Sequence, residues 1–384
     1  MDPLTNMQQR RRLNIVFVLG YPTRSRGGTE IAALAFSSML AKRGHAITAI
    51  FHHDGELIPE YQTFCDQVFV LKDAKQIGRC IAAVGKRAWR SNLVVYGHHT
   101  GWIFALRLLA SLMKARCVCH LHLPPPENMN VLARWGLRQT DLLIAVSSAT
   151  RDAWARAYCI SSSKLLAIPN GVDVLRFCPG SDDRAARAGY GLPPDCRVVS
   201  FLGRLDRQKG VDVLIRAFSL YRSQHPEQNA VLLIAGSAVL DGEIYMDELR
   251  VLAAKLGPAQ VRFVGRVAEP VNFYHASDLF VLPSVWPEPH GLTLTESLAC
   301  GVPVLASRMG GIPEILSADF PDHLFEPGDV DGLARKIAQL INWRMDSPQL
   351  GATCRNVAVS KFSLETCVDR IENNLLVLTQ KVRR

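Results

Sequence analysis

Two glutamates, Glu288 and Glu296, stand eight residues apart in the stretch EPHGLTLTESLACGVPVLAS. Pro289 and the preceding Trp-Pro predict a loop around Glu288, whereas Glu296 falls in an apolar-periodic helix. Between them, Gly291 and Thr293 mark a helix N-terminus, where backbone N–H groups and the helix dipole favour an anion. This spacing suits a ligand that carries both a phosphate and hydroxyls. A capped helix with one solvated glutamate is the alternative.

Two further loops at predicted strand ends have ligand-binding character. The sequence GRLDRQKG places Arg204 and Lys209 after a strand, and an arginine with a lysine suits a diphosphate. The sequence GYPTRSRGGTE places Gly27 and Gly28 before a helix, where a bare backbone can approach a ligand closely. This is not the G-x-G-x-x-G pattern, so it does not indicate a dinucleotide site. Surface charge and an ordinary turn are the alternatives for these two loops.

Short apolar, β-branched runs alternate with helical patterns through most of the chain, which predicts parallel sheets with crossover helices. Strands are expected at 14–20, 46–52, 67–71, 92–97, 116–122, 142–147 and 165–170, and then at 197–203, 230–237, 261–265, 279–284 and 302–307. The polar, Gly- and Pro-rich stretch 177–195 between the two series predicts a linker. A chain of 384 residues ordinarily forms more than one domain. We therefore expect an α/β protein in which two Rossmann-like domains, 1–175 and 176–363, face each other across a cleft.

Composition narrows the class of protein. No apolar run reaches the length of a membrane-spanning helix, and the N-terminal stretch has no secretory profile. The ten cysteines are scattered singly except for Cys117 and Cys119, so a reducing cytoplasm is the expected compartment. A zinc site formed by this pair with His120 and His122 is the less favoured reading, because zinc clusters usually need a second cysteine pair. No metal site is therefore expected.

The charge is uneven along the chain. Residues 1–175 hold 21 Lys and Arg against 11 Asp and Glu, and residues 176–384 hold 23 against 24. A basic half joined to a neutral half predicts that the first half meets something anionic. Nucleic acid is not the expected partner, because the sequence carries no recognised nucleic-acid-binding motif.

Four stretches together resemble the family 4 retaining glycosyltransferases of the GT-B fold: GGTEIAALAFSSMLAKRGHAITAI, IPNGVDVLRFCP, GRLDRQKGVDVLIRAF and PSVWPEPHGLTLTESLACGVPVLASRMGGIPEIL. The likeness runs from about residue 14 to about residue 345 in the family's order and spacing. It implies transfer of a sugar from a nucleotide-sugar donor with retention of the anomeric configuration. Neither a metal nor another cofactor is implied. A phosphorylase or an epimerase acting on nucleotide sugars is the alternative enzyme class.

The resemblance assigns roles position by position. It implies that Glu288 binds donor-sugar hydroxyls, that Glu296 binds the ribose hydroxyls, and that Arg204 and Lys209 bind the diphosphate together with the N–H groups of 291–294. His290 stands where the family commonly carries a phenylalanine, which puts its sugar contact in doubt. The remaining implied donor contacts are Gly28, Arg266, Val267, Gly291, Leu292 and Thr293.

The resemblance also implies a histidine at the end of a strand in the first domain. The stretch CVCHLHLPPP offers His120 and His122, and strand alternation turns both to the same side. His122 lies nearer the carboxyl end, so we assign it the active-site role and take His120 as structural. With Arg204, Lys209 and Glu288, it completes the predicted catalytic group. In YGHHTGW, His98 and His99 lie at another strand end, where a side chain can contact the acceptor; no role is assigned to either.

The acceptor is expected on the first domain, with the C-terminal helix 364–381 packing back on it. The basic residues of this domain concentrate in the stretch 72–138: Lys72, Lys75, Arg79, Lys86, Arg87, Arg90, Arg107, Lys114, Arg116, Arg134 and Arg138. They interleave with Trp89, Trp102, Ile103, Phe104 and Trp135, and basic helices that present tryptophan can lie on an anionic membrane. We therefore expect a lipid-linked or lipopolysaccharide-type glycan acceptor at the cytoplasmic membrane face. A small soluble acceptor, such as a sugar or natural product, is the alternative.

Overall fold

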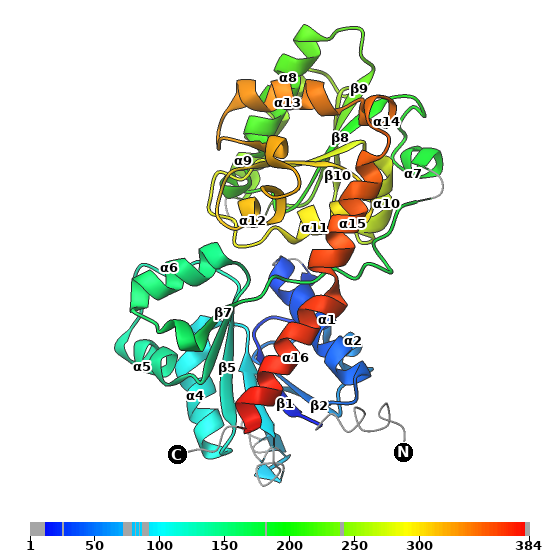
Figure 1. Ribbon diagram of the computed structural model, residues 1–384. Coiled ribbons are helices and arrows are strands. Elements are labelled where there is room, and N and C mark those ends of the chain that lie inside the picture. The colour runs from blue at the N-terminus through cyan, green and yellow to red at the C-terminus, as the bar shows by residue number, and fades with distance from the viewer. Residues whose placement is uncertain are drawn as a thin grey trace. The chain divides into compact units, whose positions relative to one another are not determined.

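The computed structural model describes residues 12–24, 27–71, 79–80, 82–83, 85–86, 92–180, 183–238 and 242–380 (Figure 1). The chain divides into two compact units. The first contains the described residues up to Gly171 together with those from Glu365 onward, and the second is Val172–Leu364. Each unit is built on one parallel sheet.

The sheet of the first unit has the strand order β3-β2-β1-β4-β5-β6-β7. Its strands are β1 (Asn14–Leu19), β2 (Ala46–Phe51), β3 (Gln67–Val70), β4 (Leu93–Gly97), β5 (Arg116–Leu121), β6 (Leu142–Ala145) and β7 (Leu165–Ala167). All seven strands of the first half were expected from the sequence. The apolar β-branched runs identified them because the central strands of a parallel sheet are buried on both faces.

Two layers of helices cover this sheet. Its helical elements are α1 (Gly28–Lys42), α2 (Ile58–Gln62), η2 (Thr100–Trp102), α4 (Ile103–Leu112), α5 (Val131–Gln139), α6 (Ser148–Tyr158), η3 (Ser162–Lys164) and, in its larger part, α16 (Leu364–Gln380). Local capping starts two of them: the side chain of Asn130 accepts from the N–H of Ala133, and that of Ser147 accepts from the N–H of Thr150. Such caps satisfy N–H groups that the first helical turn leaves without a partner.

The C-terminal helix is tied to the first unit through buried polar contacts. Arg43, which follows α1, forms ion pairs with Asp369 and Glu372 of α16. Glu372 is buried, and its second oxygen lies 3.0 Å from Nε2 of His45. One carboxylate therefore joins the end of α1 to the middle of α16.

The sheet of the second unit has the order β10-β9-β8-β11-β12-β13. Its strands are β8 (Arg197–Leu202), β9 (Ala230–Ala235), β10 (Val261–Gly265), β11 (Leu279–Leu282), β12 (Val304–Ser307) and β13 (Leu324–Phe325). Five were expected. The sixth, β13, was missed because two residues are too few to show a periodic pattern.

Its helical elements are α7 (Asp183–Gly189), η4 (Arg207–Lys209), α8 (Val211–Gln224), α9 (Gly242–Ala254), α10 (Pro270–Ala276), α11 (Leu292–Ala299), α12 (Ile312–Leu316), η5 (Pro321–His323), α13 (Val330–Leu340), α14 (Trp343–Asp346) and α15 (Leu350–Phe362). The linker expected at 177–195 is wrong in part, because α7 lies within it and buries Arg187. The units divide after Gly171 and not after residue 175. Val172 belongs to the second unit because its N–H donates to the carbonyl of Phe362 at 2.8 Å.

The strand order reverses at one point in each sheet. The first strand of the unit lies between the second and the fourth, so the reversal falls between β1 and β4 in one unit and between β8 and β11 in the other. Loops that leave neighbouring strands in opposite directions open a crevice at their carboxyl ends, and open α/β sheets bind ligands there. The two reversal points therefore indicate where each unit can hold a ligand.

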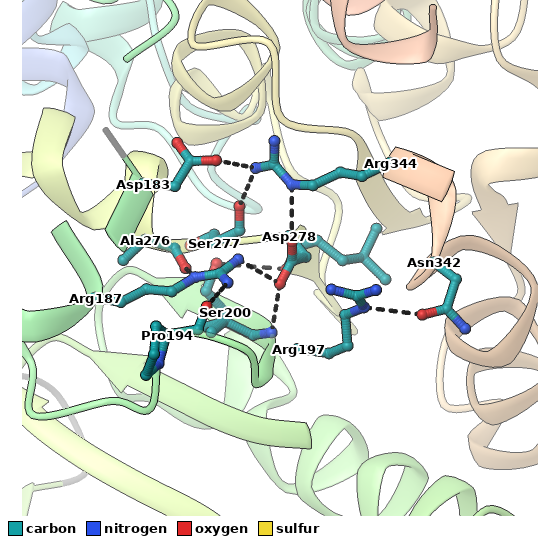
Figure 2. Close-up of polar contacts among 12 residues, drawn as sticks. Asp183, Arg187, Pro194, Arg197, Ser200, Ala276, Ser277, Asp278, Asn342 and Arg344 are labelled. Atoms are coloured by element: carbon teal, nitrogen blue, oxygen red, sulfur yellow. Dashed lines mark hydrogen bonds and ion pairs between the residues drawn. The ribbon is translucent and has the colours of Figure 1, made fainter. Parts of the chain in front are cut away.

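At the opposite end of β8 and β11, a buried carboxylate joins the two strands (Figure 2). Asp278 is fully buried, and its Oδ2 accepts from the N–H of Val198 and from Nη2 of Arg187, both at 2.8 Å. Its Oδ1 accepts from Nε of Arg344 at 2.9 Å, and its carbonyl accepts from the indole of Trp343 at 2.7 Å. The carboxylate thus holds α7 and α14 to the start of the central strands.

Replacing this carboxylate should strongly destabilise the second unit. We expect Asp278→Ala to lower the free energy of unfolding by about 3–5 kcal/mol, because Arg187 would remain buried without its counter-charge. Asp183 also pairs with Arg344 but is partly exposed, so Asp183→Ala should cost at most about 1 kcal/mol. Denaturant titration of the full chain measures both variants. Equal losses in the two would contradict the role given to Asp278.

Candidate functional site

The loops that follow β8 and β11 meet at the reversal point of the second sheet. The N–H of Val285 donates to the carbonyl of Gln208 at 2.9 Å. Gly210 has φ +63°, and a Cβ there would lie 2.2 Å from the carbonyl oxygen of Pro283. Glycine is therefore required at this position, both for the left-handed backbone and for the close approach of the two loops.

Lys209 and Glu288 form an ion pair between these loops. The ammonium of Lys209 donates to Oε2 of Glu288, and the hydroxyl of Ser284 donates to the same oxygen at 3.3 Å. The two charged side chains are only 14% and 13% exposed. The sequence predicted both residues, and the structure brings them into direct contact.

The backbone of Glu288 is held from a third loop, which follows β12. Its carbonyl accepts from the N–H of Gly311 at 2.7 Å. Gly310 has φ +56°, and a Cβ there would lie 2.2 Å from that same carbonyl oxygen. Glu288 is thus fixed through its side chain and its main chain together, which pre-organises the carboxylate before any ligand arrives.

Arg204 lies at the start of the β8 loop with its guanidinium loosely engaged. Its Nη2 is 3.3 Å from Oδ2 of Asp206 and 3.4 Å from Oε1 of Gln208. A guanidinium carries five N–H donors, and these contacts involve a single nitrogen. Arg204 can therefore bind an anion beside Lys209 while it keeps its protein contacts.

The helix α11 begins next to this pair. Its N-cap is Gly291, with φ +85° and no side-chain cap. The expectation that the N–H groups of 291–294 all face an anion is wrong at its last member, because the N–H of Leu294 donates to the carbonyl of Gly291 at 2.9 Å. Helix geometry leaves the first N–H groups, at Leu292 and Thr293, without intrahelical acceptors, so the N-terminus can still meet an anion.

His290, just before this helix, is a buried side chain. It is 4% exposed, and its ring centroid lies 6.0 Å from that of Phe362 on α15. Packing inside the second unit accounts for a ring at this position. The sugar contact suggested for His290 stays a prediction.

Glu296 lies on the buried face of α11. Its Oε2 accepts from the hydroxyl of Tyr274, on α10, at 2.7 Å. Burial raises the pKa of the Glu296 carboxyl from 4.5 to about 7, although the Tyr274 bond and the charge of Arg176 oppose the shift. The sequence predicted the glutamate but not its tyrosine, since nothing in the spacing linked the two helices.

The raised pKa predicts a pH-dependent cost of keeping Glu296 ionised. The folded protein holds this proton more tightly than the unfolded chain, so stability should fall as the pH rises from about 4.5 to about 7. Glu296→Gln should therefore be more stable than the wild type above pH 7, by up to about 3 kcal/mol. The two should converge below pH 4.5. Thermal unfolding at several pH values measures the difference, with the exposed Glu227→Gln as control. A difference that does not vary with pH would count against the raised pKa.

Arg266 and Val267 follow β10, at the edge of the same sheet. Strand β9 separates β10 from β8. The side chain of Arg266 is exposed, and Val267 packs partly against the core of the unit. Their assignment to a base pocket stays a prediction.

In the first unit, the loop after β1 carries the glycine pair. Gly27 has φ +129° and precedes α1, whereas Gly28 is the first residue of that helix. The special backbone conformation therefore belongs to Gly27, and Gly28 supplies the helix N-terminus. A small surface hollow lies beside them, lined in part by Gly20, Tyr21, Thr29, Glu30, His98 and His99.

Three histidines meet near this hollow. His98 follows β4, His120 lies on β5, and His122 follows β5. Nδ1 of His98 is 2.9 Å from Nε2 of His122, and Nδ1 of His120 is 3.0 Å from the hydroxyl of Tyr96. Burial lowers the pKa of His120 to about 3 and lowers that of His98 well below its usual value. The sequence predicted His120 and His122 on one side of the strand, but it did not predict His98 as their partner.

Strand alternation sends Cys117 and Cys119 to the opposite face. Both are buried in the cluster formed with residues of α4, α5 and α6, among them Ile103 and Trp154. His120 instead shares its face with Tyr96 and Phe17. A mixed Cys–His zinc site is therefore not formed.

Two family models match the chain. Residues 26–176 match Glycosyltransferase Family 4, and residues 182–355 match Glycosyl transferases group 1. The expected resemblance is confirmed on both units.

Curated relatives include two D-inositol 3-phosphate glycosyltransferases. That of Corynebacterium jeikeium is 32% identical over 56% of this chain and 52% of its own length. That of Streptomyces avermitilis is 31% identical over 66% of this chain and 57% of its own length. The chain thus spans about half the length of the curated relatives that it matches.

Among solved structures, Anabaena HepE in complex with UDP superposes with a TM-score of 0.80 at 22% identity, covering 94% of this chain and 99% of that one. A glycosyltransferase from Rickettsia africae superposes with a TM-score of 0.82 at 19% identity, over 96% and 100% of the two chains. At this identity the likeness concerns the fold, and the expected GT-B class is confirmed.

Proposed function

Because the chain belongs to the family 4 glycosyltransferases and has the GT-B fold, we propose that it transfers a sugar from a nucleotide-diphosphate sugar to a glycan acceptor with retention of configuration. The observation that carries the proposal is the Lys209–Glu288 pair at the reversal point of the second sheet. A cation for a phosphate and a carboxylate for hydroxyls stand side by side there, as a sugar diphosphate requires. That HepE has been crystallised with UDP-glucose supports such a donor.

In this mechanism the charge that grows on the leaving diphosphate meets donors that are already in place. When the donor binds, before transfer begins, Lys209 exchanges Glu288 for a phosphate oxygen, Arg204 adds guanidinium donors, and the N-terminus of α11 adds backbone N–H groups. Groups fixed in advance stabilise developing charge without reorganising. Since these groups neutralise the diphosphate, we propose that transfer needs no metal.

The other predicted site residues bind the sugar, the ribose and the acceptor side of the reaction. Glu288, released from Lys209, accepts hydrogen bonds from the sugar hydroxyls. Glu296, which already accepts from the hydroxyl of Tyr274, also accepts from the ribose hydroxyls. The departing diphosphate oxygen takes the acceptor's proton, so attack occurs on the face that the diphosphate leaves. His122, from the first unit, is the proposed active-site histidine.

Substitution of the two glutamates should impair different steps of the reaction. Glu296→Ala should weaken binding of the nucleoside diphosphate alone, whereas Glu288→Ala should leave that binding largely intact and lower turnover of the intact donor. A lost hydrogen bond to a charged group is worth about 1.5–3 kcal/mol, so each defect should be roughly 10- to 100-fold. Calorimetry with nucleoside diphosphates and steady-state kinetics separate the two effects. The exposed Glu227→Ala serves as control, and matching defects in both variants would overturn the assignment.

The acceptor class rests on the exposed surface of the first unit. Helix α5 presents Val131, Leu132 and Trp135 to solvent at 81%, 57% and 46% exposure. Arg134 and Arg138 are exposed on the same helix. A helix that carries both apolar and basic side chains outward is suited to an anionic lipid surface. We propose that α5 contacts the cytoplasmic face of a membrane and that the acceptor is a lipid-linked or lipopolysaccharide-type glycan.

Three residues expected in this surface are instead buried or paired within the first unit. Ile103 is fully buried, and Arg116 pairs with Asp141 at 3.1 Å. Two guanidinium nitrogens of Arg107 are buried. Lys72, Lys75, Arg87, Trp89 and Arg90 lie outside the described residues. No helix in the described part of the chain combines the length and apolar character needed to cross a membrane.

A small soluble acceptor is the second candidate. The curated relatives are named for D-inositol 3-phosphate, which would make the acceptor a phosphorylated polyol. The excess of basic residues in the first half of the chain suits such an anion as well as a lipid headgroup.

Sedimentation with vesicles distinguishes the two acceptor classes. Binding should increase with the fraction of anionic lipid and decrease as salt is added. Leu132→Ser and Trp135→Ala should each reduce it severalfold. Ile244→Ser, at an equally exposed apolar position of the second unit, should not. If the wild-type protein does not sediment with anionic vesicles at low salt, the soluble acceptor is the better proposal.

A further inference from the structure

The histidine cluster of the first unit has the composition of a metal site. His98, His120 and His122 are 3%, 3% and 7% exposed. One ring nitrogen from each lies within 4.8 Å of the others. Neutral imidazole is the commonest metal ligand among protein side chains, and three histidines with one open position form a recognised zinc geometry.

Two paired central strands place these three side chains together, with His120 on β5 and with His98 and His122 directly after the ends of β4 and β5. Strands β4 and β5 pair in parallel, with Gly97 opposite Cys119. His98 is therefore level with His120, and His122 lies two residues further along on the same side. All three come from the ends of paired central strands, where ligand positions are most precise.

Two of the ring nitrogens have no hydrogen-bond partner among the described residues. Nε2 of His98 and Nε2 of His120 are both buried and accept or donate no hydrogen bond. A buried polar atom without a partner costs about 1–3 kcal/mol, and a functional site is one of the reasons why proteins keep such atoms. Of the two, Nε2 of His120 is the atom available to a cation, because His98 meets His122 through its other ring nitrogen.

Tyr96 can select the nitrogen that His120 offers. The tyrosine hydroxyl contacts Nδ1 of His120 at 3.0 Å. If Nδ1 donates its proton to that oxygen, the lone pair is on Nε2, which is the nitrogen without a protein partner. A hydrogen bond to the second nitrogen of a ligating histidine fixes its tautomer in this way in known metal sites.

The spacing of the other two rings requires little adjustment. Nδ1 of His98 and Nε2 of His122 are 2.9 Å apart. Two nitrogens on a tetrahedral zinc, each about 2.0–2.1 Å from it, are roughly 3.3 Å apart. A shift of a few tenths of an ångström therefore lets a cation replace the proton that these two rings share.

We propose that His98, His120 and His122 form a site for a transition-metal cation of the zinc class, and that its occupation inhibits sugar transfer. The inhibitory part rests on the proposed function, in which His122 acts at the active site. A metal held by His122 withdraws that imidazole from the sugar and leaves the donor-binding residues of the second unit unchanged. The cation is thus a regulator of the enzyme and not its cofactor.

Metal binding can be measured without any activity assay. We expect the chelator-treated full chain to bind one equivalent of Zn²⁺ by calorimetry and to give the visible absorption of tetrahedral cobalt with Co²⁺. His98→Gln and His120→Gln should each weaken Zn²⁺ binding by at least about 10-fold, and Tyr96→Phe should weaken it by about 10-fold or more. His53→Gln, an exposed histidine of the same unit, should bind like the wild type.

Three outcomes would overturn the metal site: no stoichiometric Zn²⁺ binding by the wild type, an octahedral cobalt spectrum, or unchanged affinity in His98→Gln and His120→Gln. Because Co²⁺ reports on the wild type directly, poor folding of a variant does not block the test. In the transfer assay, Zn²⁺ should inhibit and EDTA should restore activity. Zn²⁺ binding without inhibition would overturn the regulatory role alone. Absence of transfer with any donor would count against the proposed function and would leave the calorimetric result to decide the site.

Discussion

The spacing of β8 and β11 is the constraint on which the donor side of the molecule depends. The strand order reverses between these two parallel strands, so the loops that leave them head in opposite directions and are nevertheless held together here. Asp278 joins the strands at their amino ends, with two arginines and a backbone N–H on its two oxygens (Figure 2). At the carboxyl ends, glycines at 210 and 310 let three loops approach within van der Waals distance. The contacts that fix β8 and β11 therefore also position Lys209 and Glu288.

Asp278 and Glu296 show how burial gives two carboxylates different uses. Asp278 is surrounded by donors, including the buried Arg187, so its charge is compensated within the protein. Glu296 has Tyr274 as its hydrogen-bond donor, and burial raises its pKa to about 7. A carboxylate with a single neutral donor gains further stabilisation when a ligand brings hydroxyls to it. The first arrangement serves the fold, and the second agrees with the ligand-binding role proposed for Glu296.

The sequence allowed the fold and the charged site residues to be predicted because both leave local signals. Buried parallel strands appear as apolar runs, and the Lys209 and Glu288 loops carry recognisable residue types. Contacts between elements distant in sequence left no such signal. Tyr274 precedes Glu296 by a strand and a loop, and Arg187 lies in a stretch whose glycines and prolines suggested a linker. His98 was noticed at a strand end, yet only the pairing of β4 with β5 identified its partner.

The two units supply different chemistry at equivalent places in their sheets. Around the β8–β11 reversal the structure gathers Arg204, Lys209 and Glu288, which are charged groups suited to a diphosphate and its sugar. Around the β1–β4 reversal it gathers a glycine loop and the buried histidines, of which His98 lines the hollow. Uncharged imidazoles bind a sugar hydroxyl weakly but bind a transition metal well. Under the two proposals made above, the same clustered histidines would serve either the sugar or a metal cation, and not both at once.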